Sequence, residues 1–121
     1  MFVAAGRVGL RVERDLWIVE DYATPSGERP VRTFIAGLAG RDRVEAFALI
    51  RLLEERGNTL RPPHSKFLGD GLFELRGHQV RIFYVFRPGQ RIILIDGVLK
   101  KQKKIATTVL QRVRKRMRLL S

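Results

Sequence analysis

Three charged side chains lie within segments that otherwise have the alternating apolar pattern of β-strands: Glu74, Arg81 and Asp96. The pairs Gly77-His78 and Pro88-Gly89 are typical of two-residue hairpin loops. With those loops, Glu74 lies opposite Arg81, and Arg81 lies opposite Asp96. An arginine binds phosphate through two parallel N–H bonds, and a neighbouring carboxylate accepts a proton. The row therefore predicts a phosphodiester site, and the alternative is an exposed ion-pair ladder that contributes about 0.2–1 kcal/mol per pair.

A run of basic residues follows the last strand-like segment. Between Lys100 and Arg118, nine side chains are basic and none is acidic. The net charge of +12 lies wholly in residues 61–121, which hold fifteen basic and three acidic side chains, whereas residues 1–60 hold nine of each. Such asymmetry predicts a surface for phosphate, on nucleic acid or on an anionic membrane. The alternative is a solvated helix face that keeps the protein soluble.

Several other kinds of site are not expected from this sequence. The chain has no Cys, which excludes a disulfide framework and a thiolate metal site. The two histidines, His64 and His78, lie in turn-like segments, so we expect no metal centre and no histidine pair for catalysis. No glycine-rich nucleotide motif is present, and no cofactor is expected.

The distribution of apolar residues places the chain among soluble proteins. No apolar stretch approaches the ~20 residues that a membrane-spanning helix needs, so no membrane partner is expected. The apolar start, Met1 to Gly6, is too short for the core of a signal peptide. We therefore expect a cytoplasmic protein, and 121 residues fit one domain.

The spacing of apolar residues predicts the elements that must hold the charged side chains. A short strand within residues 15–22 precedes a helix that begins at Pro30. A second helix begins with a capping box of Asp42 and Glu45 and ends at Gly57-Asn58. A loop over 61–70, strands over 72–76, 80–87 and 91–100, and a last helix over 107–120 complete the expected elements.

The order β, α, α, β, β, β, α predicts an α+β domain over residues 15–121, with 1–14 as a disordered extension. A two-helix hairpin is expected to cover one face of a three-stranded antiparallel meander. The first strand is expected to join this sheet at a position that the pattern leaves open. The covered face is predicted to hold Phe73, Leu75, Val80, Ile82, Tyr84, Phe86, Ile93 and Ile95. The opposite face is predicted to hold Leu72, Glu74, Arg76, Arg81, Phe83, Leu94 and Asp96.

Three sequence blocks occur together in a specific order and spacing. They are Leu-Phe-Glu-Leu-Arg at 72–76, Arg-Ile-Phe-Tyr at 81–84 and Lys-Lys-Gln-Lys-Lys at 100–104. With these blocks, the chain from about Asp15 to Arg118 resembles the HigB-like, phage-derived branch of the RelE/ParE toxin superfamily. The resemblance implies a cytoplasmic toxin of a type II toxin–antitoxin pair. It also implies a cognate antitoxin, expected to be a helix-turn-helix protein of the HigA type.

The same resemblance implies an activity and roles for particular residues. RelE-type members cleave messenger RNA on the ribosome without a metal, and the ribose 2′-hydroxyl attacks the adjacent phosphate. Messenger RNA and the ribosome are therefore expected partners. Catalytic roles are implied for Glu74, Arg81, Lys100 and Lys101. RNA-binding roles are implied for Lys66, Arg76, Lys103 and Lys104.

The sequence also departs from the family pattern. HigB-like members often carry His where this chain has Asp96, and some relatives carry a Tyr near the C-terminus that 107–110 lacks. These differences leave alternatives open. One is a non-catalytic, ParE-like toxin that inhibits gyrase or another macromolecule by binding. Another is a degenerate toxin that binds only RNA or its antitoxin.

Overall fold

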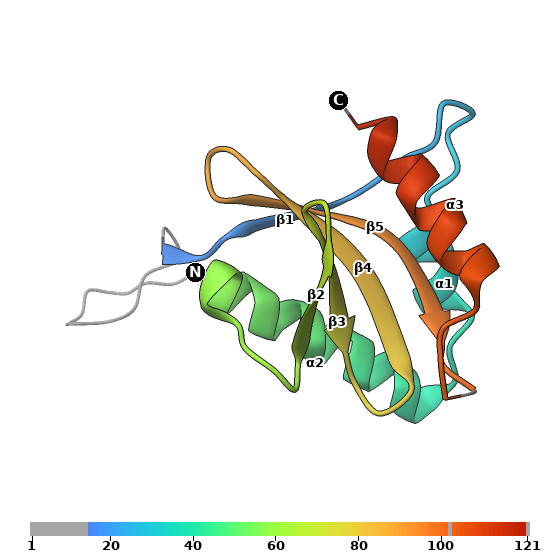
Figure 1. Ribbon diagram of the computed structural model, residues 1–121. Coiled ribbons are helices and arrows are strands. Elements are labelled where there is room, and N and C mark those ends of the chain that lie inside the picture. Colours follow the sequence, from blue (N-terminus) through green and yellow to red (C-terminus); the bar gives the residue numbers. More distant parts are fainter. Residues whose placement is uncertain (1–14, 102, 121) are drawn as a thin grey trace.

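The computed structural model describes residues 15–101 and 103–120 (Figure 1). The extension predicted over residues 1–14 lies outside the described residues. The described strands are β1 (Ile18–Asp21), β2 (Ser65–Gly69), β3 (Leu72–Arg76), β4 (Val80–Arg87) and β5 (Arg91–Leu99). The described helices are α1 (Pro30–Ala36), α2 (Gly40–Arg56) and α3 (Thr107–Arg118), with a 3-10 turn over Gly57–Thr59.

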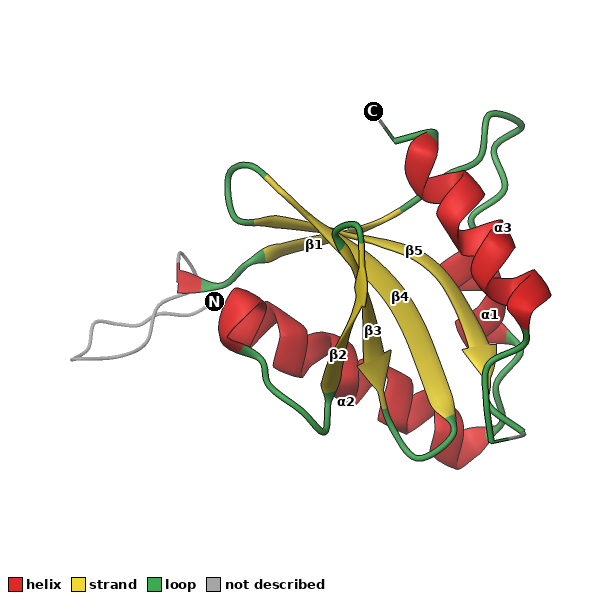
Figure 2. Cartoon of the chain, in the orientation of Figure 1, coloured by secondary structure: helices red, strands yellow, loops and turns green. Residues whose placement is uncertain are grey.

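The five strands form one sheet in the order β1-β5-β4-β3-β2. Strands β2 to β5 form an antiparallel meander, and β1 joins the edge parallel to β5. Helices α1 and α2 cover one face, and α3 lies on the other (Figure 2). The predicted α+β class is therefore confirmed.

The prediction of a loop over 61–70 is wrong, because this segment contains β2. Asp70 and Gly71 turn the chain between β2 and β3, with φ of 55° and 80°. Two consecutive positive φ angles are what a two-residue hairpin turn requires, and Asp-Gly is a preferred pair there. The meander therefore has four strands instead of three.

The predicted register between β3 and β4 is also wrong. Arg76 pairs with Arg81 instead of Gln79, because the turn closes with Gly77 N–H donating to the Val80 carbonyl at 2.9 Å. Glu74 consequently lies opposite Phe83. The shift is an even number of residues, so the side chains keep their predicted faces.

The β4–β5 turn differs from the prediction by one residue, which reverses the faces near it. Arg87 pairs with Arg91 across a three-residue loop, in which Gln90 has a φ of 55°. Leu94 therefore packs under α1 and α2, whereas Ile93 and Ile95 pack under α3. The predicted faces of these three side chains are wrong, because an odd shift turns each one over.

A bulge in the same pair of strands then changes the position of Asp96. The register shifts between Phe83 and Tyr84, so that Asp96 lies opposite Phe83. Asp96 therefore lies on the predicted face, which is the α3 face, but it does not lie opposite Arg81. The predicted row of Glu74, Arg81 and Asp96 is therefore wrong at both steps: neither Glu74 nor Asp96 lies directly opposite Arg81, although all three share a face.

Each face of the sheet has an apolar core of its own. Leu49 and Leu53 of α2 pack against Leu75, Ile82 and Tyr84 on one face. On the other face, apolar residues of α3 pack against the sheet, and Val113 is fully buried. The sheet side of this second core consists of Leu72, Phe83, Val85, Ile93 and Ile95.

The capping box predicted at the start of α2 is absent. The helix begins at Gly40, its N-cap is Ala39, and no side chain caps it. Asp42 lies within the first turn, where a negative charge suits the helix dipole. Glu45 instead reaches the β3–β4 turn, where its Oε2 accepts a hydrogen bond from the His78 N–H at 3.0 Å.

Candidate active site

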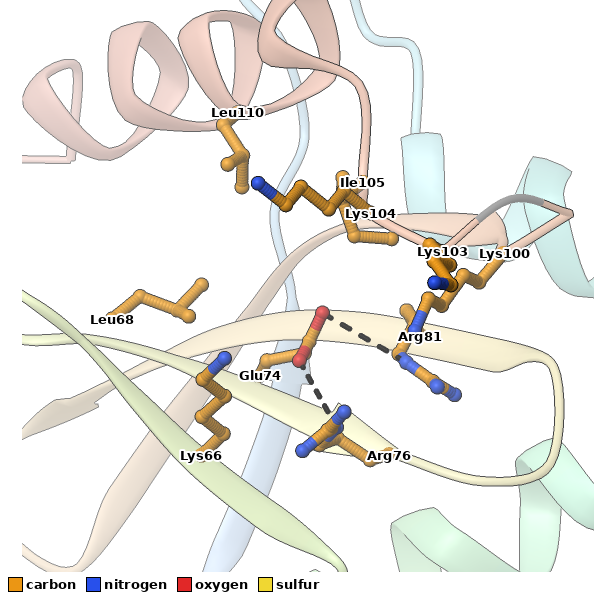
Figure 3. Close-up of a pocket in the computed structure, with 10 residues that line it drawn as sticks. All are labelled: Lys66, Leu68, Glu74, Arg76, Arg81, Lys100, Lys103, Lys104, Ile105 and Leu110. Carbon is orange, nitrogen blue, oxygen red and sulfur yellow. Dashed lines mark ion pairs between the residues drawn. The ribbon is translucent and has the colours of Figure 1, made fainter.

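A cavity of about 320 Å³ lies on the α3 face, between the β2–β3–β4 part of the sheet and the segment that joins β5 to α3 (Figure 3). It brings together seven of the eight residues for which site roles were predicted. Lys101 is exposed and does not line the cavity. The lining consists of Lys66, Leu68, Glu74, Arg76, Arg81, Lys100, Lys103, Lys104, Ile105 and Leu110.

The only carboxylate in this lining is Glu74, which is buried in the middle of β3. Its Oε1 lies 3.3 Å from Arg76 Nε, and its Oε2 lies 3.9 Å from Arg81 Nε. Glu74 and Arg76 are two residues apart on one strand, so their side chains share a face. Figure 3 shows the carboxylate between the two guanidinium groups. An anion held this way has oxygens that are oriented before any substrate arrives.

The guanidinium of Arg81 is fixed by the main chain of the β3–β4 turn. Nη1 donates to the Gly77 carbonyl at 2.7 Å and to the Val80 carbonyl at 3.0 Å. Within the described part of the chain, the buried Nε–H has no hydrogen-bond partner. Burial lowers the pKa of Arg81 and the charge of Glu74 raises it, yet an arginine remains protonated at neutral pH. Arg81 therefore provides a fixed, almost fully buried cation beside Glu74 in the cavity lining.

Four lysines complete the basic lining of the cavity. Lys66 comes from β2 and lies on one side of Glu74 in Figure 3, whereas Lys103 and Lys104 come from the segment after β5. Lys100 is half-buried at the end of β5, where its N–H donates to the Gln79 carbonyl at 2.7 Å. None of these lysines forms an ion pair with another described residue, so their charges are available to a ligand.

Asp96 does not belong to this site. Its carboxylate accepts hydrogen bonds from Arg112 Nε at 2.7 Å, from Arg116 Nη1 and from the Gly97 N–H. Arg114 adds a bond to the Leu68 carbonyl at 2.7 Å. The arginines of α3 thus attach this helix to the sheet, a role that the sequence analysis did not assign to them. The spacing of Arg112 and Arg116, one helical turn apart, was the available signal.

The geometry can be set beside known proteins. Residues 33–118 match the family described as phage-derived protein Gp49-like (DUF891). The chain belongs to this family. Gp49-like proteins are a family of RelE/HigB-type toxins, so the predicted membership of the RelE/ParE superfamily is confirmed, and the assignment supports a toxin of a toxin–antitoxin system.

Two further comparisons add little to the family assignment of this Gp49-like chain. No curated protein matches it. Among solved structures, the toxin–antitoxin complex RelBE2 from Mycobacterium tuberculosis contains a similar chain, with a TM-score of 0.45 and 14% identity. That match covers 72% of this chain and 94% of the other.

Other kinds of site were sought over the same residues of the Gp49-like chain. Residues 15–101 and 103–120 contain no group of three or more His, Asp or Glu side chains that could hold a metal ion. Over the same ranges, no helix is long and apolar enough to cross a membrane. His64 and His78 are both exposed, as expected for turn residues.

Proposed function

We propose that this Gp49-like toxin is an endoribonuclease that cleaves messenger RNA on the ribosome. The observation that carries the proposal is the cavity lining, in which one buried carboxylate stands among six basic side chains. A phosphodiester brings one negative charge to such a site and develops more in the transition state. Fixed cations at this position stabilise that added charge.

The side chains that line the cavity are suited to a reaction in which the ribose 2′-hydroxyl attacks the adjacent phosphate. Glu74 accepts the hydroxyl proton, the 2′ oxygen bonds to phosphorus, and the bond to the 5′ oxygen breaks as that oxygen takes a proton from solvent water. The products are a 2′,3′-cyclic phosphate and a 5′ hydroxyl. The guanidinium groups of Arg81 and Arg76, which line the cavity, hold the phosphate oxygens. Lys100, half-buried at the rim, is the cation we assign to the leaving oxygen.

The remaining lysines are assigned to RNA binding. Lys66, Lys103 and Lys104 are exposed on flexible stems around the cavity, where they attract RNA backbone by charge. Lys101, which the resemblance implied as catalytic, is proposed to act only by such attraction, because it lies outside the lining. No metal or cofactor has a step in this scheme.

We propose an acidic antitoxin as the stable partner of the free toxin. The charge of +12 lies in residues 61–121, the part of the chain that builds the cavity. An anionic segment laid over this face neutralises it and excludes RNA. The resemblance favours a helix-turn-helix antitoxin of the HigA type, and translating ribosomes place the action in the cytoplasm.

The test of the proposed activity is Glu74→Gln. This change keeps the size of the side chain and removes its basicity, so cleavage of ribosome-bound messenger RNA should fall about 10²–10⁴-fold. The measurement is single-turnover cleavage together with mapping of messenger 5′ ends after brief induction. Glu55→Gln is the control, because Glu55 is an exposed carboxylate paired with Arg51 on α2. Cleavage by Glu74→Gln at the wild-type rate would reduce Glu74 to a partner in ion pairs.

One observation favours a second function. No His or Tyr lines the cavity, so an obvious general acid is missing, and Glu74 is already engaged by Arg76. A ParE-like toxin that inhibits gyrase or another macromolecule by binding needs neither group. Intact messages together with arrested replication after induction would support this function over cleavage.

A further inference from the structure

The carboxylate of Glu45 contacts the β3–β4 turn from the opposite face of the sheet. Its Oε2 accepts the His78 N–H at 3.0 Å. A Cβ added to Gly77 would lie 2.5 Å from both Oε1 and Cδ of Glu45, so only glycine allows this approach. Figure 1 shows the first half of α2 beside the loop between β3 and β4. The turn is therefore held from below by a side chain that takes no part in the cavity.

The same turn holds the guanidinium of Arg81 from the other side. The carbonyls of Gly77 and Val80 both accept hydrogen bonds from Arg81 Nη1. The Glu45 carboxylate thus occupies the space that a side chain at position 77 would need, and the Gly77 carbonyl oxygen accepts a hydrogen bond from Arg81. Any movement of this one residue changes the place of the guanidinium.

The two charges also act on one another directly. Burial lowers the pKa of Arg81, and the charges of Glu74 and, to a smaller extent, Glu45 oppose this lowering. Among the described residues, the buried Oε1 of Glu45 has no hydrogen-bond partner. An unpartnered buried carboxylate oxygen is costly, so turn capping alone does not account for a full charge at this position.

We propose that Glu45 is a positioning residue for Arg81, which it places through the Gly77-His78 turn. Glu45 does not line the cavity that holds Glu74 and Arg81, and it acts without touching RNA. The inference rests on the proposed function of the Arg81 site for its effect on cleavage. Its structural part, the placing of the guanidinium, stands independently of that function.

The structural part is tested by the rotation of the Arg81 Nη groups, measured by NMR in the free protein. In the wild type, two carbonyls hold Nη1 and rotation is slow. Glu45→Ala should speed it by roughly tenfold, the factor expected when one charge-assisted hydrogen bond is weakened. Glu45→Gln keeps an oxygen for the His78 N–H but removes the charge, so it should restore most of the slow rotation and remain slightly faster than the wild type. Glu55→Gln removes the same charge from the exposed side of α2 and should change nothing.

Gly77→Ala provides a second, independent variant. The added methyl must displace the Glu45 carboxylate or the turn, since it would also lie 2.9 Å from Leu49 Cδ1. If both changes act on one turn, the combined variant Glu45→Ala with Gly77→Ala should be no worse than the more severe single one. Additive effects on Arg81 rotation would overturn the proposal, as would unchanged rotation in folded Glu45→Ala.

The catalytic part is tested by single-turnover cleavage at saturating ribosomes. Glu45→Ala should slow the bound reaction roughly 10-fold to 100-fold, the scale of a misplaced catalytic group, and leave ribosome affinity unchanged. A loss of affinity at an unchanged bound rate would contradict the inference. If the wild type cleaves nothing while Glu45→Ala still frees Arg81, the proposed function fails and the positioning role stands.

Discussion

The two faces of the sheet both contain buried side chains but differ in their chemistry. Leu75 and Glu74 are neighbours on β3 and are 0% and 4% exposed, yet they point to opposite faces. Leu75 enters the continuous apolar core under α1 and α2. Glu74 enters a basic cavity beside α3. One strand therefore supplies stability on one side and reactive groups on the other.

The difference shows how a small domain can afford buried charge. In the core under α1 and α2, the hydroxyl of Tyr84 is paired with the Ser65 hydroxyl at 3.1 Å. Burial raises the pKa of Tyr84, which stays neutral at physiological pH. On the α3 face the apolar packing covers only part of the sheet, and the remainder is the charged cavity. Substitutions on the two faces should therefore have separable effects on stability and on activity.

The largest expected effect comes from opening the apolar face. Tyr84 is 1% exposed and stacks against Phe73, so Tyr84→Ala should reduce the free energy of unfolding by about 3–5 kcal/mol. Tyr84→Phe removes only the bond to Ser65 and should cost about 1 kcal/mol. Denaturant titration measures both values. Equal losses for the two variants would mean that the hydroxyl pair, and not ring packing, stabilises this face.

On the α3 face, the fixed guanidinium of Arg81 and the exposed ammonium groups of Lys103 and Lys104 should have different roles. We expect Arg81 to act in cleavage and the two lysines to act in ribosome binding. Arg81→Ala should slow cleavage about 10²–10³-fold, because it removes a preorganised donor, and leave ribosome association intact. Replacing Lys103 and Lys104 by Gln should weaken association and flatten its salt dependence, with far less effect on the bound rate. Ribosome pelleting across a salt series, beside single-turnover cleavage, measures both.

Two outcomes would contradict this division of roles between Arg81 and the two lysines. Normal cleavage by bound Arg81→Ala would mean that Arg81 serves only to hold the β3–β4 turn. Normal binding by the Lys103 and Lys104 variant, with an unchanged salt slope, would mean that the ribosome is recognised elsewhere.

The periodicity of the sequence predicted most of the helices and strands. The errors arose at the turns, where strand boundaries and register are set. The stripe of α3 and the start of α1 at Pro30 followed from spacing and backbone constraint. Strand β2 was missed because Pro62-Pro63 and the glycines near it indicate a loop. The pair Asp70-Gly71 was the signal for a hairpin, since that turn needs a strand on each side.

Seven of the eight residues with predicted site roles line one cavity, but their contacts were not predicted. Glu74 and Arg81 were identified as charged residues within apolar strands. Both lie on the predicted face of the sheet, because the β3–β4 register differs from the predicted one by an even number of residues. Asp96 does not lie opposite Arg81, because the turn at Pro88-Gly89 shifts the register by one residue and a bulge shifts it again. The local sequence does not predict the position of a bulge. The reach of Glu45 to His78 joins residues 33 positions apart and depends on how α2 packs, which no local pattern encodes.

A smaller effect than that of Tyr84→Ala is expected from a change in how each helical layer is attached. Whereas α1 and α2 are held by apolar contacts, α3 is also fastened by arginines that converge on Asp96. Asp96→Asn keeps the acceptor for the Gly97 N–H and weakens the bonds to Arg112 and Arg116, which can turn to solvent. We therefore expect a loss of only about 1–2 kcal/mol of unfolding free energy. Hydrogen exchange should show faster opening of α3 amides with α2 amides unchanged, because the change acts on one layer. Equally faster exchange in both helices would mean that the two layers open as one unit. The two faces would then differ in their residues but would not unfold independently.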